Sequence, residues 1–146
     1  LVSSSAASDV YKRQELGCFS VSPAVKDLAA SIAFYEKLGF TALGGDDSYR
    51  MLANGSTVIG LFAGHIEETI LTFNPGLGQD FAQKSTESGG DGVPEPLEEF
   101  TDVRVIEQRL KDGGVTLDAE TDTDEGPGHI ILRDPDGHLI MFDQFF

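Results

Sequence analysis

The 146-residue sequence predicts an α+β fold built from two tandem βαβββ modules. Two observations predict it. The apolar periodicity changes in the order strand, helix and three strands, and the same order then occurs again. The two halves also match each other at an offset of 75 residues, because Asp27 and Gly39 correspond to Asp102 and Gly114. Two copies of one structural unit explain both observations.

The first module, at about residues 17–66, is predicted to begin with a strand over residues 18–25, where apolar and polar side chains alternate. A helix is expected to follow over residues 27–37. Asp27 is a typical N-cap for this helix, and Gly39 is suited to the left-handed conformation that ends it.

A hairpin is predicted next, because apolar runs at residues 49–53 and 57–62 flank Asn54-Gly55, a dipeptide typical of tight primed turns. Another strand is expected over residues 68–73, and it opens the second module, at about residues 67–146.

The second module is predicted to contain a helix over residues 102–111, which Gly113-Gly114 ends. A turn is expected at Asp134-Pro135-Asp136-Gly137, because Pro135 presets φ and Gly137 accepts a left-handed position. Three strands are expected in this module, at residues 115–117, 129–133 and 139–142.

Two segments are not assigned to the modules. Residues 78–100 are rich in Gly, Ser, Glu and Pro, and we interpret them as a loop excursion on the surface, with a lid over a pocket as the alternative. Residues 1–14 are small and polar without apolar periodicity, so we interpret them as a disordered or non-native tail.

The charge and the cysteine content exclude several function classes. The chain has 10 Lys and Arg against 25 Asp and Glu, which gives a formal net charge of −15. This charge repels phosphate backbones and anionic headgroups, so we expect no nucleic-acid or membrane partner. No stretch approaches 18 consecutive apolar residues. Cys18 has no partner for an internal disulfide, and we expect a cytoplasmic protein.

Residues 25–40, with the sequence VKDLAASIAFYEKLGF, together with Asp134-Pro135-Asp136-Gly137 and Ile140, resemble the vicinal-oxygen-chelate superfamily. That superfamily includes glyoxalase I, extradiol dioxygenases, fosfomycin-resistance enzymes and bleomycin-resistance proteins. The resemblance covers roughly residues 17–144 apart from the excursion. It implies mixed sheets that curve around a cavity, helices on the outer face, and a homodimer.

Metal-dependent members of this superfamily place one ligand in the first and one in the last strand of each module. The resemblance puts these positions at Ser20, Gly60, Glu68 and Met141, with Thr69 in place of Glu68 if the register slips by one. The family has His, Glu or Gln there, whereas this chain has only Glu68 as a strong ligand. Such a centre needs about three protein ligands, so we expect no metal and no other cofactor.

Two carboxylates are the candidate catalytic groups. Asp143 follows Met141 by two residues and therefore shares its strand face, so Glu68 and Asp143 could both point into the cavity. Solvated charges at the rim are the alternative. If both lined the pocket, they would favour a cationic ligand, and like-charge repulsion would raise one pKa into a range suited to proton transfer.

Other side chains are candidates for contact with a ligand, although a hydrophobic core would use the apolar ones equally well. Arg50 is the cation expected nearest the cavity. The full set of candidates is Ser20, Arg50, Gly60, Phe62, Glu68, Ile70, Thr72, His129, Met141 and Asp143.

The histidines and the cysteine have structural alternatives. His65, Glu68 and His129 could form a metal cluster if their strands converge, but His65, His129 and His138 have no spacing typical of paired ligands, so scattered surface histidines are favoured. Cys18 is interpreted as a small buried residue.

Three functions follow from these observations. The favoured one is a metal-free pocket that binds a cationic or aromatic small molecule, as in bleomycin-resistance-type sequestration. The alternative is a metal-dependent enzyme, either a glyoxalase I-like lyase or a dioxygenase, with a divalent ion such as Zn, Ni or Fe. A third is metal-free acid–base chemistry by Glu68 or Asp143, in which Glu68→Gln would abolish turnover.

Overall fold

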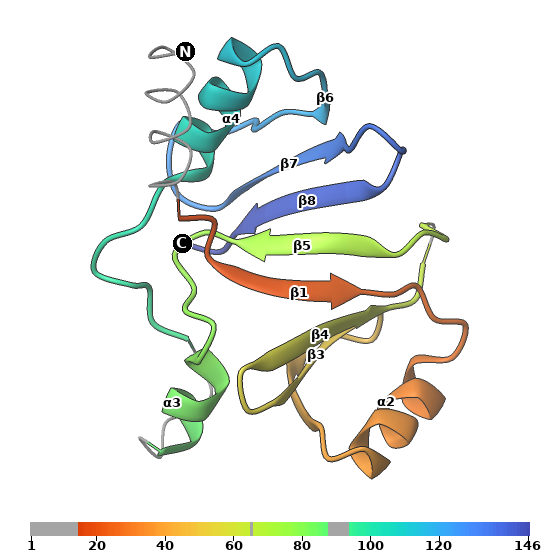
Figure 1. Ribbon diagram of the computed structural model, residues 1–146. Coiled ribbons are helices and arrows are strands. Elements are labelled where there is room, and N and C mark those ends of the chain that lie inside the picture. The colour runs from red at the N-terminus through yellow and green to blue at the C-terminus, as the bar shows by residue number, and fades with distance from the viewer. Residues whose placement is uncertain (1–14, 65, 88–93) are drawn as a thin grey trace, which may run out of the picture.

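The computed structural model describes residues 15–64, 66–87 and 94–146, which form one eight-stranded mixed sheet with helices around it (Figure 1). The first module comprises β1 (Cys18–Ser22), α2 (Leu28–Lys37), β2 (Thr41–Gly45), β3 (Tyr49–Asn54) and β4 (Thr57–Phe62). The second comprises β5 (Ile70–Asn74), α3 (Phe81–Glu87), α4 (Val103–Asp112), β6 (Leu117–Ala119), β7 (Gly128–Arg133) and β8 (Leu139–Gln144). The strand order is β2-β3-β4-β1-β5-β8-β7-β6, which confirms the two modules.

The modules join edge to edge through the first strand of each. Strand β1 lies parallel to β4 and β5 lies parallel to β8, while β1 and β5 pair antiparallel. Ser20 pairs with Thr72 at the middle of the β1–β5 ladder. The two modules are therefore related by an approximate twofold axis that passes near this pair.

The predicted helix ends are confirmed. The Asp27 carboxylate accepts a hydrogen bond from the Ala30 backbone N–H at 3.0 Å, and the Asp102 carboxylate accepts one from the Arg104 N–H at 2.9 Å. Gly39 follows α2 with a φ of 96°, in the left-handed region. In the described ranges no helix combines the length and the hydrophobicity that crossing a membrane requires.

The predicted hairpin is also confirmed, with its turn one residue later than the dipeptide indicates. The last pair joins Asn54 to Thr57, so the loop residues are Gly55 and Ser56. Gly55 has a φ of 59°, which a primed turn with glycine in the first position requires.

Several strands differ from their predicted ranges. Strand β1 ends at Ser22, three residues before the predicted end, and β8 continues to Gln144, two residues beyond its predicted end. Strand β2 had no predicted range of its own, and β5 begins two residues later than expected and includes Asn74. Strand β6 begins at Leu117 because Val115 still belongs to the end of α4. The Val115 N–H donates to the Leu110 carbonyl at 2.9 Å, which is the long-range bond of a Schellman cap.

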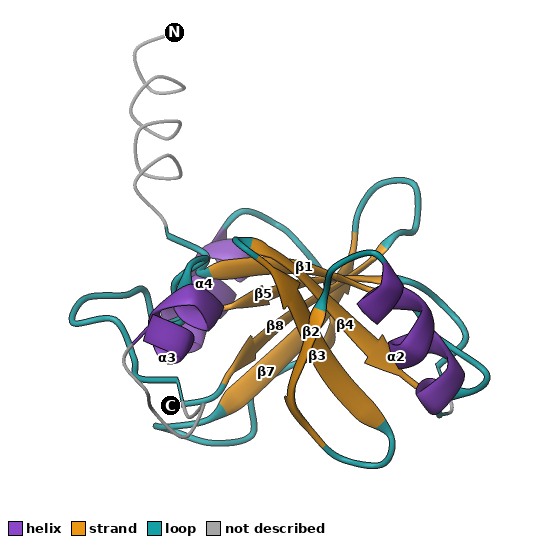
Figure 2. Ribbon diagram, turned by 90° about the horizontal axis from the view of Figure 1, so that it is seen from below, coloured by secondary structure: helices purple, strands orange, loops and turns teal. Residues whose placement is uncertain are grey.

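The sheet has two different faces. Helix α4 packs on the outer face, where Val103 and Ile106 form a core cluster with Ile130, Leu132 and Phe142. Helix α2 lies beside β3 and β4, on the opposite side of the molecule from α3 and α4 (Figure 2), and Figure 1 shows α3 and α4 at opposite ends of that side. We call the other face of the sheet, which α4 does not cover, the inner face.

The segment predicted as a surface excursion is partly a packed helix. Residues Phe81–Glu87 form α3, and Leu77 before it and Ala82 within it are buried. The polar composition of residues 78–100 hid this, because the apolar contacts with the core cluster come from Leu77, Phe81 and Ala82, which lie within six positions. Residues 88–93 of the excursion and the predicted tail 1–14 lie outside the described residues.

Candidate ligand-binding site

Four adjacent strands place one residue each in a row across the inner face. Cys18 of β1 pairs with Asn74 of β5, and Asp143 of β8 pairs with His129 of β7. The Asn74 side-chain amide donates to the Asp143 carbonyl at 2.9 Å and so joins the two pairs. We call these four residues the polar row.

A second row lies next to the polar row and is more apolar. It consists of Ser20, Thr72, Met141 and Ile131, one from each of the same strands. The Thr72 hydroxyl forms a 3.0 Å hydrogen bond with the hydroxyl of Ser22. Because Met141 and Ile131 are half-buried, they form an apolar wall beside the polar row.

Two buried polar atoms of this surface have no hydrogen-bond partner within the described ranges. They are the Ser20 hydroxyl and the Asn74 side-chain carbonyl, and both residues are only 1% exposed. Buried polar groups are nearly always hydrogen-bonded, so unpartnered ones mark places where a water or a ligand group belongs. Asn74 accepts there, and Ser20 accepts or donates.

Burial controls the electrostatics of the inner face. It raises the pKa of the Asp143 carboxyl, which the positive field of His129 partly opposes. Burial also raises the pKa of Tyr49 to about 12, with Asp143 and Cys18 adding to the effect, and it raises the pKa of Cys18 to about 11. No described side chain donates a hydrogen bond to the Asp143 carboxylate.

Tyr49 occupies the space in front of Gly60. A β-carbon added at Gly60 would lie 2.8 Å from the Ser22 hydroxyl oxygen and 3.0 Å from the Tyr49 hydroxyl oxygen. These contacts are too short for real atoms, so position 60 does not accept a side chain while Tyr49 stays in place. A ligating residue at this position is therefore incompatible with the local packing.

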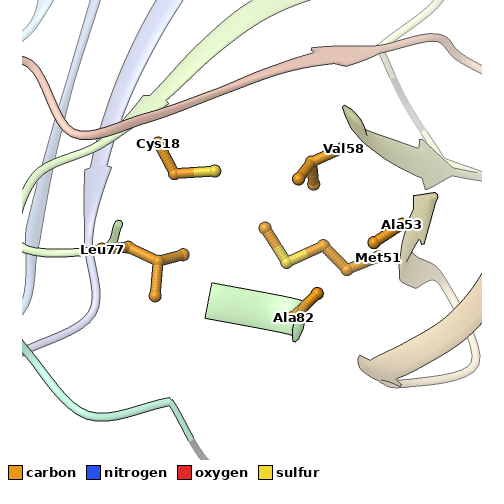
Figure 3. Close-up of a cluster of buried hydrophobic side chains, with 6 residues drawn as sticks. All are labelled: Cys18, Met51, Ala53, Val58, Leu77 and Ala82. Carbon is orange, nitrogen blue, oxygen red and sulfur yellow. The ribbon is translucent and has the colours of Figure 1, made fainter. Parts of the chain in front are cut away.

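The first module's half of the inner face is filled by the protein itself. Figure 3 shows six buried side chains that point toward a common centre: Cys18, Met51, Ala53 and Val58 from the strands, and Leu77 and Ala82 from the segment after β5. The part of the inner face that remains for a ligand is the centre of the sheet and the second module's half.

The structure brings most of the predicted site residues to one face. Strand alternation and pairing place these candidates on the inner face: Ser20, Gly60, Phe62, Ile70, Thr72, His129, Met141 and Asp143. Arg50 differs, because it alternates with Tyr49 and Met51 and so lies on the outer face. Its guanidinium donates to the Leu43 carbonyl at 3.5 Å.

Glu68 does not lie beside Asp143. It precedes β5 in a loop, and both of its carboxylate oxygens accept hydrogen bonds from Arg133 at 2.8 Å. These bonds lower the pKa of Glu68. Ile70 pairs with Leu139, which lies four residues, or roughly 13 Å of strand, before Asp143 along β8, and Glu68 lies two residues further away, before Ile70. The expected like-charge pair does not form, and burial alone raises the pKa of Asp143.

The residues do not fit a transition-metal centre of the kind the superfamily resemblance implies. At the four expected positions stand a serine, a glycine, a glutamate held by Arg133, and a methionine. Within the described ranges, one group of His, Cys, Asp and Glu residues could share an ion, namely Asp134, Asp136 and His138 in the β7–β8 turn. Asp134 is already occupied there, since its carboxylate accepts from the backbone N–H groups of Asp136 and His138.

The alternative of a metal cluster of His65, Glu68 and His129 is not tested, because His65 lies outside the described ranges. His138 contacts Asp134 in its turn at 2.7 Å. Sequence reasoning missed Asn74 and Tyr49. The alternation along β5 continues from Ile70 and Thr72 to Asn74, and it could have identified Asn74 as a residue of the inner face. No pattern in the sequence indicated Tyr49.

Several solved structures share this fold. A glyoxalase/bleomycin resistance protein/dioxygenase superfamily member from Vibrio splendidus is 15% identical, with a TM-score of 0.54 over 86% of this chain and 97% of that one. A chain named NAD-dependent benzaldehyde dehydrogenase from Legionella pneumophila is 16% identical, with a TM-score of 0.54 over 88% and 99%. Homoprotocatechuate 2,3-dioxygenase from Brevibacterium fuscum is 16% identical, with a TM-score of 0.55 over 90% of this chain.

The match to the dioxygenase covers 37% of that chain, so this protein spans about a third of its length. At these identities the likeness concerns the fold alone. No curated protein matches the sequence. Residues 20–142 do match a family, and together with the two paired modules this match shows that the chain belongs to the glyoxalase/bleomycin resistance protein/dioxygenase superfamily.

Proposed function

We propose that the inner face binds a small cationic molecule with an apolar body, without a metal, as in bleomycin-resistance-type sequestration. The observation that carries this proposal is Asp143, a half-buried carboxylate to which no described side chain donates a hydrogen bond. Withdrawal from water makes its ionised form costly, and a ligand cation would offset that cost.

The charges around the site favour the same ligand. The described strands bring two basic residues to the inner face, Arg133 and His129. Arg133 is already paired with Glu68 and, at 3.3 Å, with Asp118. A net charge of −15 adds a long-range field that attracts cations. An anionic substrate would find neither a free guanidinium on these strands nor a favourable field.

The remaining contacts suit an apolar body with hydrogen-bond donors. Met141 and Ile131 provide an apolar wall next to Asp143, and Phe62 lies on the same face in β4. Asn74 offers an acceptor without a partner in the described structure. We therefore propose an aromatic or aliphatic cation that carries N–H groups.

Calorimetric titration with benzamidinium, a flat aromatic cation, tests the proposal. We expect the unmodified protein to bind it and Asp143→Asn to bind at least about tenfold more weakly, because the partner charge is lost. Glu68→Gln is the matched control, since it makes the same chemical change at a carboxylate that Arg133 already neutralises. Equal affinity in Asp143→Asn and the unmodified protein would contradict the proposal.

Metal independence has its own measurement. Elemental analysis of protein purified without chelators or metal affinity resin should show no transition metal, and titration with Zn²⁺ or Ni²⁺ should show no uptake on the inner face. A metal content near one ion per chain would instead favour the lyase or dioxygenase alternative.

We also propose that the protein works in the cytoplasm as a homodimer, as superfamily membership suggests. Sedimentation equilibrium of the purified chain is expected to give twice the mass of 15.7 kDa.

A further inference from the structure

We propose that residues 76–84 form a displaceable cover over the first module's half of the inner face, held closed by the Gln79 side chain. The cover packs on Cys18, at the edge of the site of the proposed function, and its biological use rests on that function. Its test needs no ligand, so a failure of the cover and a failure of ligand binding are distinguishable.

Gln79 attaches the cover to the start of β1, at a position where β1 has no neighbouring strand on the β4 side. Its amide oxygen accepts from the Phe19 N–H at 2.7 Å, and its amide nitrogen donates to the Phe19 carbonyl at 2.9 Å. The same nitrogen also donates to the Ser56 carbonyl at 2.8 Å. Strand β4 begins at residue 57 and pairs with β1 at Val21, so at Phe19 the Gln79 amide takes the place of a neighbouring strand.

These bonds hold the cover without locking it. All three lie at exposed positions, where water competes for the same groups and the net contribution of each bond is small. The helix in the cover, α3, has seven residues, which is too short to be stable by itself. Leu77 and Ala82 of the cover lie among side chains of the sheet (Figure 3), and Phe81 packs against the same cluster.

The surface beneath the cover is suited to solvent or to a ligand. Leu77 packs in one cluster with Cys18, which is fully buried. Beside Cys18 on the same face are the two buried atoms without partners, the Ser20 hydroxyl oxygen and the Asn74 amide oxygen. Closing the cover leaves these groups unsatisfied, whereas opening it lets water or the N–H donors of a ligand reach them.

Cys18 is the single cysteine of the chain and reports directly on the cover. The experiment measures the rate at which a coloured aromatic disulfide reagent modifies it in the intact protein. In the closed form the thiol is fully buried and modification is expected to be slow. We expect Gln79→Ala to raise the rate about tenfold, the effect of losing several weak hydrogen bonds.

The control variant is Gln108→Ala, which removes an exposed glutamine amide on α4 that bonds to Asp112. It should label at the unmodified rate. If the cover opens locally, the labelling rate should hardly change at low urea concentrations. Global unfolding, followed by circular dichroism, should instead depend steeply on urea. The inference is overturned if Gln79→Ala labels at the unmodified rate, or if labelling follows urea as steeply as unfolding does.

Discussion

At the residue scale, Asp143 links the stability of the protein to pH. The folded state binds its proton more tightly than the unfolded state, because burial raises its pKa above the ordinary value of 3.8. Its contribution to the free energy of unfolding is therefore lost as pH rises from 3.8 through the raised pKa. We expect Asp143→Asn to be more stable than the unmodified protein near neutral pH.

Urea unfolding of both proteins at about pH 3 and about pH 7 checks this expectation. The difference between them should vanish at the lower pH, where Asp143 is protonated in both states. A difference of the same size at both values would mean that the effect comes from packing and not from ionisation.

Gly60 gives a second prediction at this scale. Gly60→Ala should lower the free energy of unfolding by about 1–3 kcal/mol, because the new methyl group would overlap the hydroxyl oxygens of Ser22 and Tyr49. Gly64→Ala is the control, since no atom lies within 4 Å of the added carbon there. Equal unfolding midpoints for the two variants would show that Tyr49 moves aside freely.

At the element scale, the end of β8 holds the start of α4. The Gln144 amide oxygen accepts from the Val103 N–H at 2.8 Å, and its nitrogen donates to the Asp102 carboxylate at 3.0 Å and to the Phe146 carbonyl at 2.9 Å. Burial alone would raise the pKa of Asp102, but the hydrogen bonds from Gln144 and Arg104 outweigh it and lower that pKa. A buried side chain of the sheet thus completes the helix N-terminus.

We therefore expect Gln144→Ala to lower the free energy of unfolding by roughly 1–3 kcal/mol, because it leaves buried groups without partners. Gln108→Ala, at an exposed position, should change it by less than about 0.5 kcal/mol. Urea midpoints of the two variants measure both effects, and a Gln144→Ala midpoint equal to that of Gln108→Ala would show that water replaces the amide.

At the scale of the whole molecule, the net charge of −15 opposes compactness and attracts cations. Raising the ionic strength from about 0.01 to about 0.15 M shortens the screening length to about 8 Å. The Tm should therefore rise while benzamidinium binding weakens. Thermal unfolding and calorimetry at the two salt concentrations test this. A benzamidinium affinity that is independent of salt would show that the long-range field does not contribute to binding.

Local chemistry made much of the fold predictable. Asp27 and Asp102 act as caps and Gly39 takes its left-handed φ, because these roles depend on the residue itself and its near neighbours. Alternation along single strands placed Met141 and Asp143 on one face for the same reason. These local features identified the superfamily. They did not identify the ligand of this protein, because caps and turns determine the fold and do not take part in binding or chemistry.

The tertiary structure alone decided which of those side chains meet. Register between strands far apart in the chain sets the polar row and moves Glu68 away from Asp143 to Arg133. Packing of three apolar residues turned an apparently polar loop into the cover. The amino-acid sequence by itself therefore determined the modules and their caps. The site depended on contacts such as the one between Asn74 and Asp143, which are 69 residues apart in the chain and which no local pattern encodes.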